Sequence, residues 1–239
     1  MNLFKLELLK IKLSTYLWAI AGIFASLLAL GILFLIIFQF EMGASGTFDD
    51  EDLFANWEGL LALTTALSFA CFSIFSAVIA AKVIINEYCE KNAVILLSYP
   101  INRKSILKTK CIIVCAITAI SACISNLLVV ILMFLTAQIF HIMPKMNTEH
   151  FALFVLFSSI LMGILSSAVG IISVVCGWKK RSVIATIVCS LIVVCSTTNL
   201  IAAYPNHILW IMLAMSVIFV MIAHFLYHIL TKEIEKLEV

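Results

Sequence analysis

The sequence is short of charge. Asp, Glu, Lys and Arg together make up 12% of the 239 residues, whereas hydrophobic residues make up 64%. Soluble domains carry roughly a quarter charged residues, so this chain has too few charges to cover a water-facing surface. The scarcity excludes an ordinary soluble globule and indicates that lipid is the solvent for most of the surface.

Several chemical signatures are also missing. The chain has no G-x-x-x-x-G-K-[ST] phosphate loop, no H-E-x-x-H zinc motif and no G-x-S-x-G nucleophile turn. Its eight cysteines form no C-x-x-C pair. The sequence therefore predicts no catalytic residue, no metal site and no cofactor bound by this chain. A membrane protease, the rival enzyme, lacks its catalytic set.

Six long apolar runs stand in place of these motifs. Each is near or above the roughly 20 residues that a helix needs to cross a bilayer core, and lipid leaves the backbone no partner but itself, which favours helices. The predicted spans are 17–40, 58–86, 111–140, 150–176, 184–203 and 209–230. The predicted fold is an all-α membrane protein with six transmembrane helices in a single domain, residues 1–239.

The stretch before the first span mixes lysines with apolar residues. Residues 1–16 are predicted to form an N-terminal interfacial helix, because lysines at this position lie well near anionic headgroups. The alternative is a first span that is longer by one or two turns.

Both termini are predicted to lie in the cytoplasm. With six spans, the termini and the segments 87–110 and 177–183 share one side of the membrane. Counting Lys82 at a helix end, this side holds every lysine and arginine except Lys145. The positive-inside rule assigns such a side to the cytoplasm, so the chain is expected to be a multi-pass membrane protein.

Small and polar residues inside the spans form three groups. Two rows of small residues at helical spacing predict packing faces: Ala66, Ala70, Ser73, Ala77 and Ala81 in the second span, and Gly163, Ser166, Ser167 and Gly170 in the fourth. Polar groups are costly in lipid unless they face a partner or water. Ser121, Ser125, Asn126 and Asn199 are therefore candidates for a substrate path, with an interhelical hydrogen bond as the equal alternative.

Residues 87–110, EYCEKNAVILLSYPINRKSILKTK, carry a resemblance to a known family. The segment resembles the part of type-2 ATP-binding-cassette (ABC) exporter permeases where a Glu-rich span end leads to a leucine pair, a proline, an arginine and a closing lysine. The matching positions are Glu87, Glu90, Leu96, Leu97, Pro100, Arg103 and Lys110. The chain length and the six spans fit the family as well. Asn92, Ala93 and Thr109 depart from its pattern.

The resemblance implies that this segment couples the chain to a separate ATPase subunit. In the family it forms a short helix that docks on the ATPase, which binds ATP and Mg. A basic rim of Arg103, Lys104, Lys108 and Lys110 would suit an acidic partner surface. Expected partners are ABC ATPase subunits, a second permease copy or a sister permease, and the lipid bilayer, but no nucleic acid. The alternative is a loop whose charge only sets topology. A second basic loop, residues 177–182, could make a weaker second contact with the ATPase, and for this loop the two interpretations are equally open.

The substrate class is a further expectation: a cationic or amphipathic antimicrobial peptide, with export of a lipid, a drug or an ion as the alternatives. Small permeases of this size resemble those that give bacterial cells immunity or resistance to bacitracin and lantibiotics. An acidic patch in the first outer loop could attract such cationic antimicrobial peptides. It consists of Asp49, Asp50, Glu51 and Asp52. Two rival functions are a non-transporting membrane scaffold or sensor subunit and a secondary carrier of small solutes.

Overall fold

Long helices make up the described part of the chain. The computed structural model describes residues 13–45, 57–86, 103–140, 148–204 and 207–236. It contains α2 (Leu13–Ser45), α3 (Trp57–Ala80), the π-helical turn η1 (Ala81–Ile85), α6 (Arg103–Ile139), α7 (Thr148–Lys180), α8 (Val183–Ala203) and α9 (Ile208–Lys236). Six helices within these residues are long and apolar enough to cross a membrane. The predicted all-α fold with six spans is therefore confirmed.

The start of the third long helix differs most from its predicted span. α6 begins at Arg103 rather than at residue 111, because the intervening RKSILKTK consists mostly of residues that favour helix. Residues 1–12 of the predicted interfacial helix lie outside the described residues, and residues 13–16 belong to α2.

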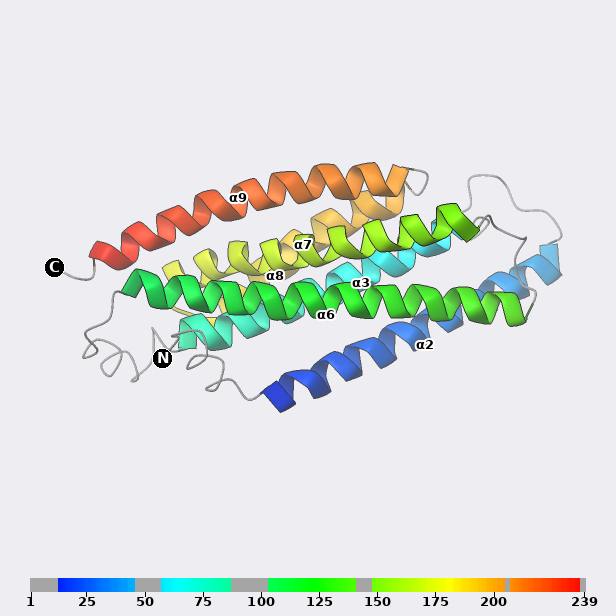
Figure 1. Ribbon diagram of the computed structural model, residues 1–239, viewed down its shortest axis with the longest axis horizontal. Coiled ribbons are helices and arrows are strands. Elements are labelled where there is room, and N and C mark those ends of the chain that lie inside the picture. The colour runs from blue at the N-terminus through cyan, green and yellow to red at the C-terminus, as the bar shows by residue number, and fades with distance from the viewer. Residues whose placement is uncertain (1–12, 46–56, 87–102, 141–147, 205–206, 237–239) are drawn as a thin grey trace.

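The helices lie side by side, and helices that follow each other in the chain run in opposite directions (Figure 1). α3 and α7 occupy the centre. α3 packs against α6, α7 and α8, whereas α7 packs against α6, α8 and α9 as well as α3. α2 lies at the edge of the bundle and contacts α6 and α3. The described helices thus form a two-helix centre with the others around it.

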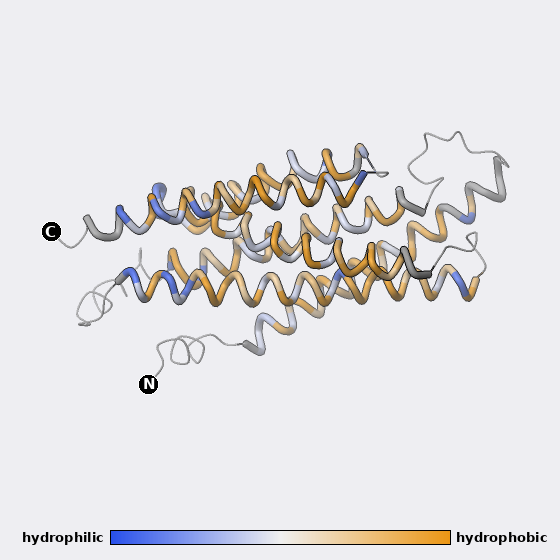
Figure 2. The backbone as a smooth tube through the Cα atoms, turned by 45° about the horizontal axis from the view of Figure 1, so that its top comes forward, coloured by the Kyte–Doolittle hydropathy of each residue, from blue (hydrophilic) through white to orange (hydrophobic). Residues whose placement is uncertain are grey.

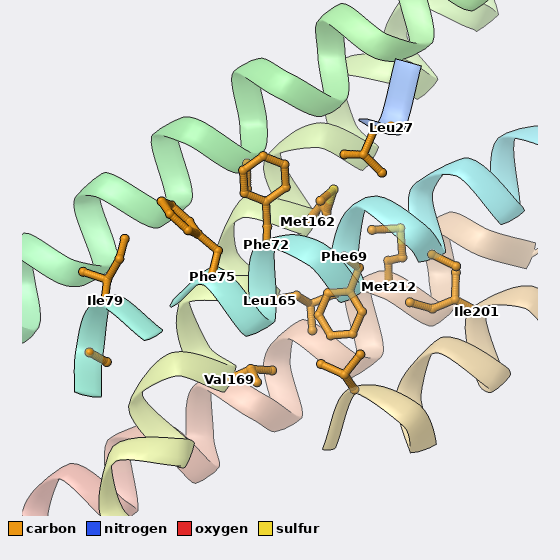
Figure 3. Close-up of a cluster of buried hydrophobic side chains, with 14 of the residues drawn as sticks. Leu27, Phe69, Phe72, Phe75, Ile79, Met162, Leu165, Val169, Ile201 and Met212 are labelled. Carbon is orange, nitrogen blue, oxygen red and sulfur yellow. The ribbon is translucent and has the colours of Figure 1, made fainter. Parts of the chain in front are cut away.

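Buried apolar side chains fill the space around this centre (Figure 3). Phe69 and Phe72 of α3 are fully buried, as is Met162 of α7. In lipid such contacts stabilise the bundle through close packing and dispersion, since lipid tails are as apolar as the side chains. The same cluster includes Leu27, Phe75, Ile79, Leu165, Val169, Ile201 and Met212.

Small residues bring α7 close to both α6 and α3, as the sequence predicts. A Cβ atom at Gly163 would lie 2.8 Å from the backbone oxygen of Ala119 on α6, and one at Gly170 would collide with Ser76 on α3. Ser73, Ala77 and Ala81 of the other predicted face are buried too. Both packing faces are therefore confirmed.

One end of the bundle gathers the basic residues. Figure 2 shows hydrophilic stretches near the helix ends and hydrophobic stretches between them. The start of α2, the turn η1, the start of α6, the turn between α7 and α8 and the end of α9 all lie at one end (Figure 1). This basic end, as we call it, carries Lys82, Lys104, Lys108, Lys110, Lys179, Lys180, Arg181 and Lys232.

Candidate functional site

The predicted coupling segment begins and ends at the basic end. Its residues Glu87, Glu90, Leu96, Leu97 and Pro100 lie outside the described residues. The structure describes the two ends that flank them, η1 with Asn86 on one side and α6 on the other. Arg103 is the first residue of α6, and Lys110 lies two turns further along this helix.

The end of the second span is a π-helical turn. In η1 the backbone N–H of Asn86 donates to the carbonyl oxygen of Ala81, five residues earlier. A π-turn holds one residue more than an α-turn between bonded groups, and such turns are frequent at functional sites. Ala81, Val83, Ile84 and Ile85 are buried, so this wide turn is enclosed by the surrounding helices.

Lys110 reaches into this turn. Its side chain is fully buried, with 0% exposed, and its Nζ donates to the carbonyl oxygen of Val83 over 3.2 Å. The last carbonyls of a helix have no partner within the helix, and the negative end of the helix dipole favours a cation there. Lys110 thus caps the end of α3 and η1 from a neighbouring helix.

The burial of Lys110 differs from its predicted place on a basic rim. Lys104 and Lys108 are exposed, but Lys110 does not reach the surface. The sequence did contain a signal: Leu107, Lys110 and Val114 are three and four residues apart, on one helical face, and all three are buried. Its part in ATPase coupling stays a prediction, with a different contact from the one expected.

A second contact ties η1 to the first long helix. Nζ of Lys82 lies 5.8 Å from the ring centroid of Tyr16 on α2, within the range of a cation–π interaction. The Tyr16 ring also meets the Phe75 ring edge to face, with centroids 6.4 Å apart. The start of α2 is therefore held against both α3 and η1.

The turn between α7 and α8 lies within residues 177–182, a basic loop that could make a second, weaker contact with the ATPase, and it is tight and well bonded. The N–H of Arg181 donates to Trp178 O over 3.2 Å, and the N–H of Ser182 donates to Gly177 O over 3.1 Å. With Arg181 at φ 46°, this is the Schellman pattern that ends many helices. Lys179, Lys180 and Arg181 are exposed, so the turn presents basic side chains at the basic end.

This turn also lies close to η1. A Cβ atom at Gly177 would collide with Thr186 of α8 and with the side chain of Ile85 in η1. η1 contacts α6, α7 and α8. The π-turn is thus the place where the start of α6 and the turn between α7 and α8 come together.

Of the candidate path residues, three are buried. Nδ2 of Asn126 donates to Oγ of Ser159 on α7 over 3.1 Å, while its Oδ1 has no partner among the described residues. Ser121 donates to Thr118 O over 3.1 Å, and Ser125 is 4% exposed. The pairing with Ser159 corresponds to the interhelical hydrogen bond, the alternative that the sequence left open. Lining of a path by these residues stays a prediction.

The fourth candidate is separate from the others. Asn199 on α8 is exposed, and its Nδ2 donates to Cys195 O of its own helix over 2.7 Å. The structure therefore does not bring it together with Asn126. The acidic patch Asp49, Asp50, Glu51 and Asp52 lies outside the described residues.

A comparison with protein families identifies the family of this chain. A family model described as "ABC-2 family transporter protein" matches residues 3–196. The curated "Uncharacterized protein YcbO" of Bacillus subtilis (strain 168) is 28% identical over 195 residues, which are 81% of this chain and 82% of that protein. No solved structure matches the chain. The matched residues include all of the basic end except α9.

Proposed function

This chain belongs to the ABC-2 family of transporter proteins, and we propose that it is an exporter permease that couples to a separate ATPase subunit through residues 87–110. Membership makes it the membrane component of an ABC transporter, and its six apolar helices make it a multi-pass membrane protein. ATP and Mg would be bound by the partner. The basic end would face the cytoplasm, with both termini.

The observation that carries this proposal is the position of the two flanks of residues 87–102. One flank is η1 and the other is the start of α6, and both lie at the basic end. There Lys110 of α6 joins the two flanks by donating to Val83 O of η1. Because the two flanks are joined to each other, movement of residues 87–102, which we call the docking segment, would pass from them into the spans. The exposed Lys104 and Lys108 beside it would favour an acidic partner surface.

The test is purification of the tagged protein from its native membrane in mild detergent, with partners identified and ATPase activity assayed. A stoichiometric ATPase subunit should accompany the wild-type protein and should be lost from the double variant Arg103→Glu, Leu97→Asp. The matched control is Lys232→Glu, which makes the same charge reversal at an exposed site on α9 and should retain the partner. A wild-type protein with no ATPase would instead favour the scaffold or the secondary carrier.

The second contact can be tested without disturbing its turn. Arg181→Gly removes the charge but suits the positive φ at this position, which glycine adopts freely. If the α7–α8 turn also touches the ATPase, this variant should lower ATPase recovery while the fold stays intact. Full recovery would leave the turn as a topological signal only.

The proposed substrate is a cationic antimicrobial peptide of the bacitracin or lantibiotic kind, exported from a bacterial cell membrane. Its support is the outer acidic patch, Asp49 to Asp52, which would concentrate cationic peptides. Neutralising Asp49, Asp50, Glu51 and Asp52 to the amides should weaken the protection of cells against nisin and bacitracin. Unchanged protection, at equal protein levels, would remove this role from the patch.

A complete transporter would need a second membrane subunit, either another copy of this chain or a sister permease. Mass determination of the purified complex distinguishes the two, because a sister permease would appear as a second multi-pass chain. We propose two permease subunits and their ATPase subunits as the functional unit.

A further inference from the structure

Lys110 stands apart from the other charged residues. Among the side chains that the structure describes, it is the one charged group that is buried. An ionisable residue within a membrane span is costly and is by default a candidate for function. Its contact is also long-range, because Lys110 and Val83 are 27 residues apart in the chain. The intervening residues include the whole proposed docking segment.

We propose that Lys110 is a positioning residue that transmits movement of the docking segment to α3 by holding the π-turn η1 to α6. The inference rests on the proposed function, since it needs an ATPase partner that moves the segment. Nothing in it requires Lys110 to touch the ATPase. It assigns the lysine a role inside the membrane subunit, between its two flanking helices.

The geometry supports a firm link. A hydrogen bond from a charged donor to a carbonyl is stronger than a neutral one, and in this enclosed site water does not compete readily for either group. Because Lys110 is two turns into α6 and Val83 lies within η1, their bond fixes the two helices to each other at the basic end. Movement of one flank is then shared by the other.

The π-turn gives this link something to act on. One extra residue in a helical turn can be removed by conversion to an α-turn, which rotates the residues beyond the turn by about 100° and shifts them by about 1.5 Å. η1 lies at the end of the second span, the most buried of the described spans, in whose most apolar stretch 72% of the residues are buried. A change of register at η1, controlled through Lys110, would reach the centre of the bundle directly.

The experiment compares hydrogen–deuterium exchange of the whole complex without nucleotide and with ATP and vanadate. Lys110→Met keeps the length of the side chain but removes the donor and the charge. In the nucleotide-free state we expect about tenfold faster exchange in residues 84–86, because a charge-assisted hydrogen bond no longer holds the turn. The nucleotide-dependent change in 81–86 should disappear, while the change in 103–108 persists.

The control and a second variant sharpen this test. Lys232→Met removes an exposed lysine of the same end and should leave both nucleotide-dependent changes in place. Lys110→Gln, shorter and neutral, should behave as Lys110→Met. A variant that binds the ATPase, hydrolyses ATP and still shows the change in 81–86 would overturn the inference.

The other possible results of the exchange experiment also test the inference. Absence of an ATPase from the wild-type preparation would reject the proposed function itself, which distinguishes that failure from failure of the link. If neither Lys110 variant yields a folded complex, the buried amine serves the fold rather than transmission, and the inference is overturned. A merely structural role would speed exchange in both nucleotide states but leave the difference between them.

Discussion

Two helices of equal length, α2 and α7, lie in opposite environments. Each has 33 residues. In the most apolar stretch of α7, 61% of the residues are buried, compared with 17% in α2. Yet α2 is the more hydrophobic of the two. In this protein the more apolar helix faces outward, the reverse of a soluble globule.

The difference arises from the environment that lipid offers to each side chain. Large apolar side chains gain little by leaving lipid for a protein interior, so those of α2 can stay outside. Leu33, Ile36 and Phe40 of α2 are exposed. Small residues allow close approach, and α7 carries Gly163 and Gly170 where neighbouring helices touch it. Size at the contact, rather than hydrophobicity, decides which helix lies at the centre.

The largest predicted effect is that of Gly163→Ala. The added Cβ would lie 2.8 Å from the backbone oxygen of Ala119, which cannot rotate away, so α6 and α7 would have to separate. We expect a loss of about 1–3 kcal/mol in the free energy of unfolding, measured by reversible denaturation in mixed SDS micelles. A loss below this range would show that α6 and α7 separate more easily than their close contact suggests.

Gly22→Ala is the matched control on α2. Nothing lies within 4 Å of a Cβ at this position, and alanine favours helix over glycine. The same assay should show no loss and a gain of up to about 1 kcal/mol. Equal losses at Gly22 and Gly163 would contradict the comparison between the two helices.

An intermediate effect is predicted for Gly31→Ala, also on α2. Its Cβ would meet Sδ of Met133 at 2.7 Å, but methionine is flexible and can move aside. We expect a loss under about 1 kcal/mol in the same denaturation assay, between the values for the other two glycines. A loss as large as that of Gly163→Ala would mean that α2 is held as firmly as α7.

The hydrogen bond between Asn126 and Ser159 gives a smaller predicted effect. A double-mutant cycle with Asn126→Ala and Ser159→Ala should give a coupling of about 0.6 kcal/mol, the average for such bonds in membranes. A coupling near zero, together with altered export, would favour a path-lining role for Asn126 over the structural one.

The sequence predicted the helices better than their contacts. Six apolar runs were enough for the six spans, because a run of this length has no other stable form in lipid. The packing role of Gly163 and Gly170 was also predictable, since small residues recur there at helical spacing. Both predictions depend on local pattern alone.

The features of the candidate site depend on distant parts of the chain. The π-turn at Ala81–Ile85 arises where α6, α7 and α8 meet the end of the second span, and AKVII contains no residue that demands it. Lys110 lies among several basic residues, and its burial is indicated in the sequence by the face it shares with Leu107 and Val114. The pairing of Asn126 with Ser159 likewise required knowledge of which helices are neighbours.

The smallest predicted effect concerns Asn199→Leu. Asn199 is exposed and bonded to Cys195 O of its own helix, so its replacement should change the unfolding free energy by less than about 0.5 kcal/mol. Combined with a peptide-protection assay, the variant tests what covers this face of α8. Unchanged stability with lost protection would place Asn199 on the substrate path or at the second permease. If both stability and protection are unchanged, lipid covers this face of α8. Asn199 is then removed from the candidates for a substrate path, and Asn126 and its two neighbouring serines remain.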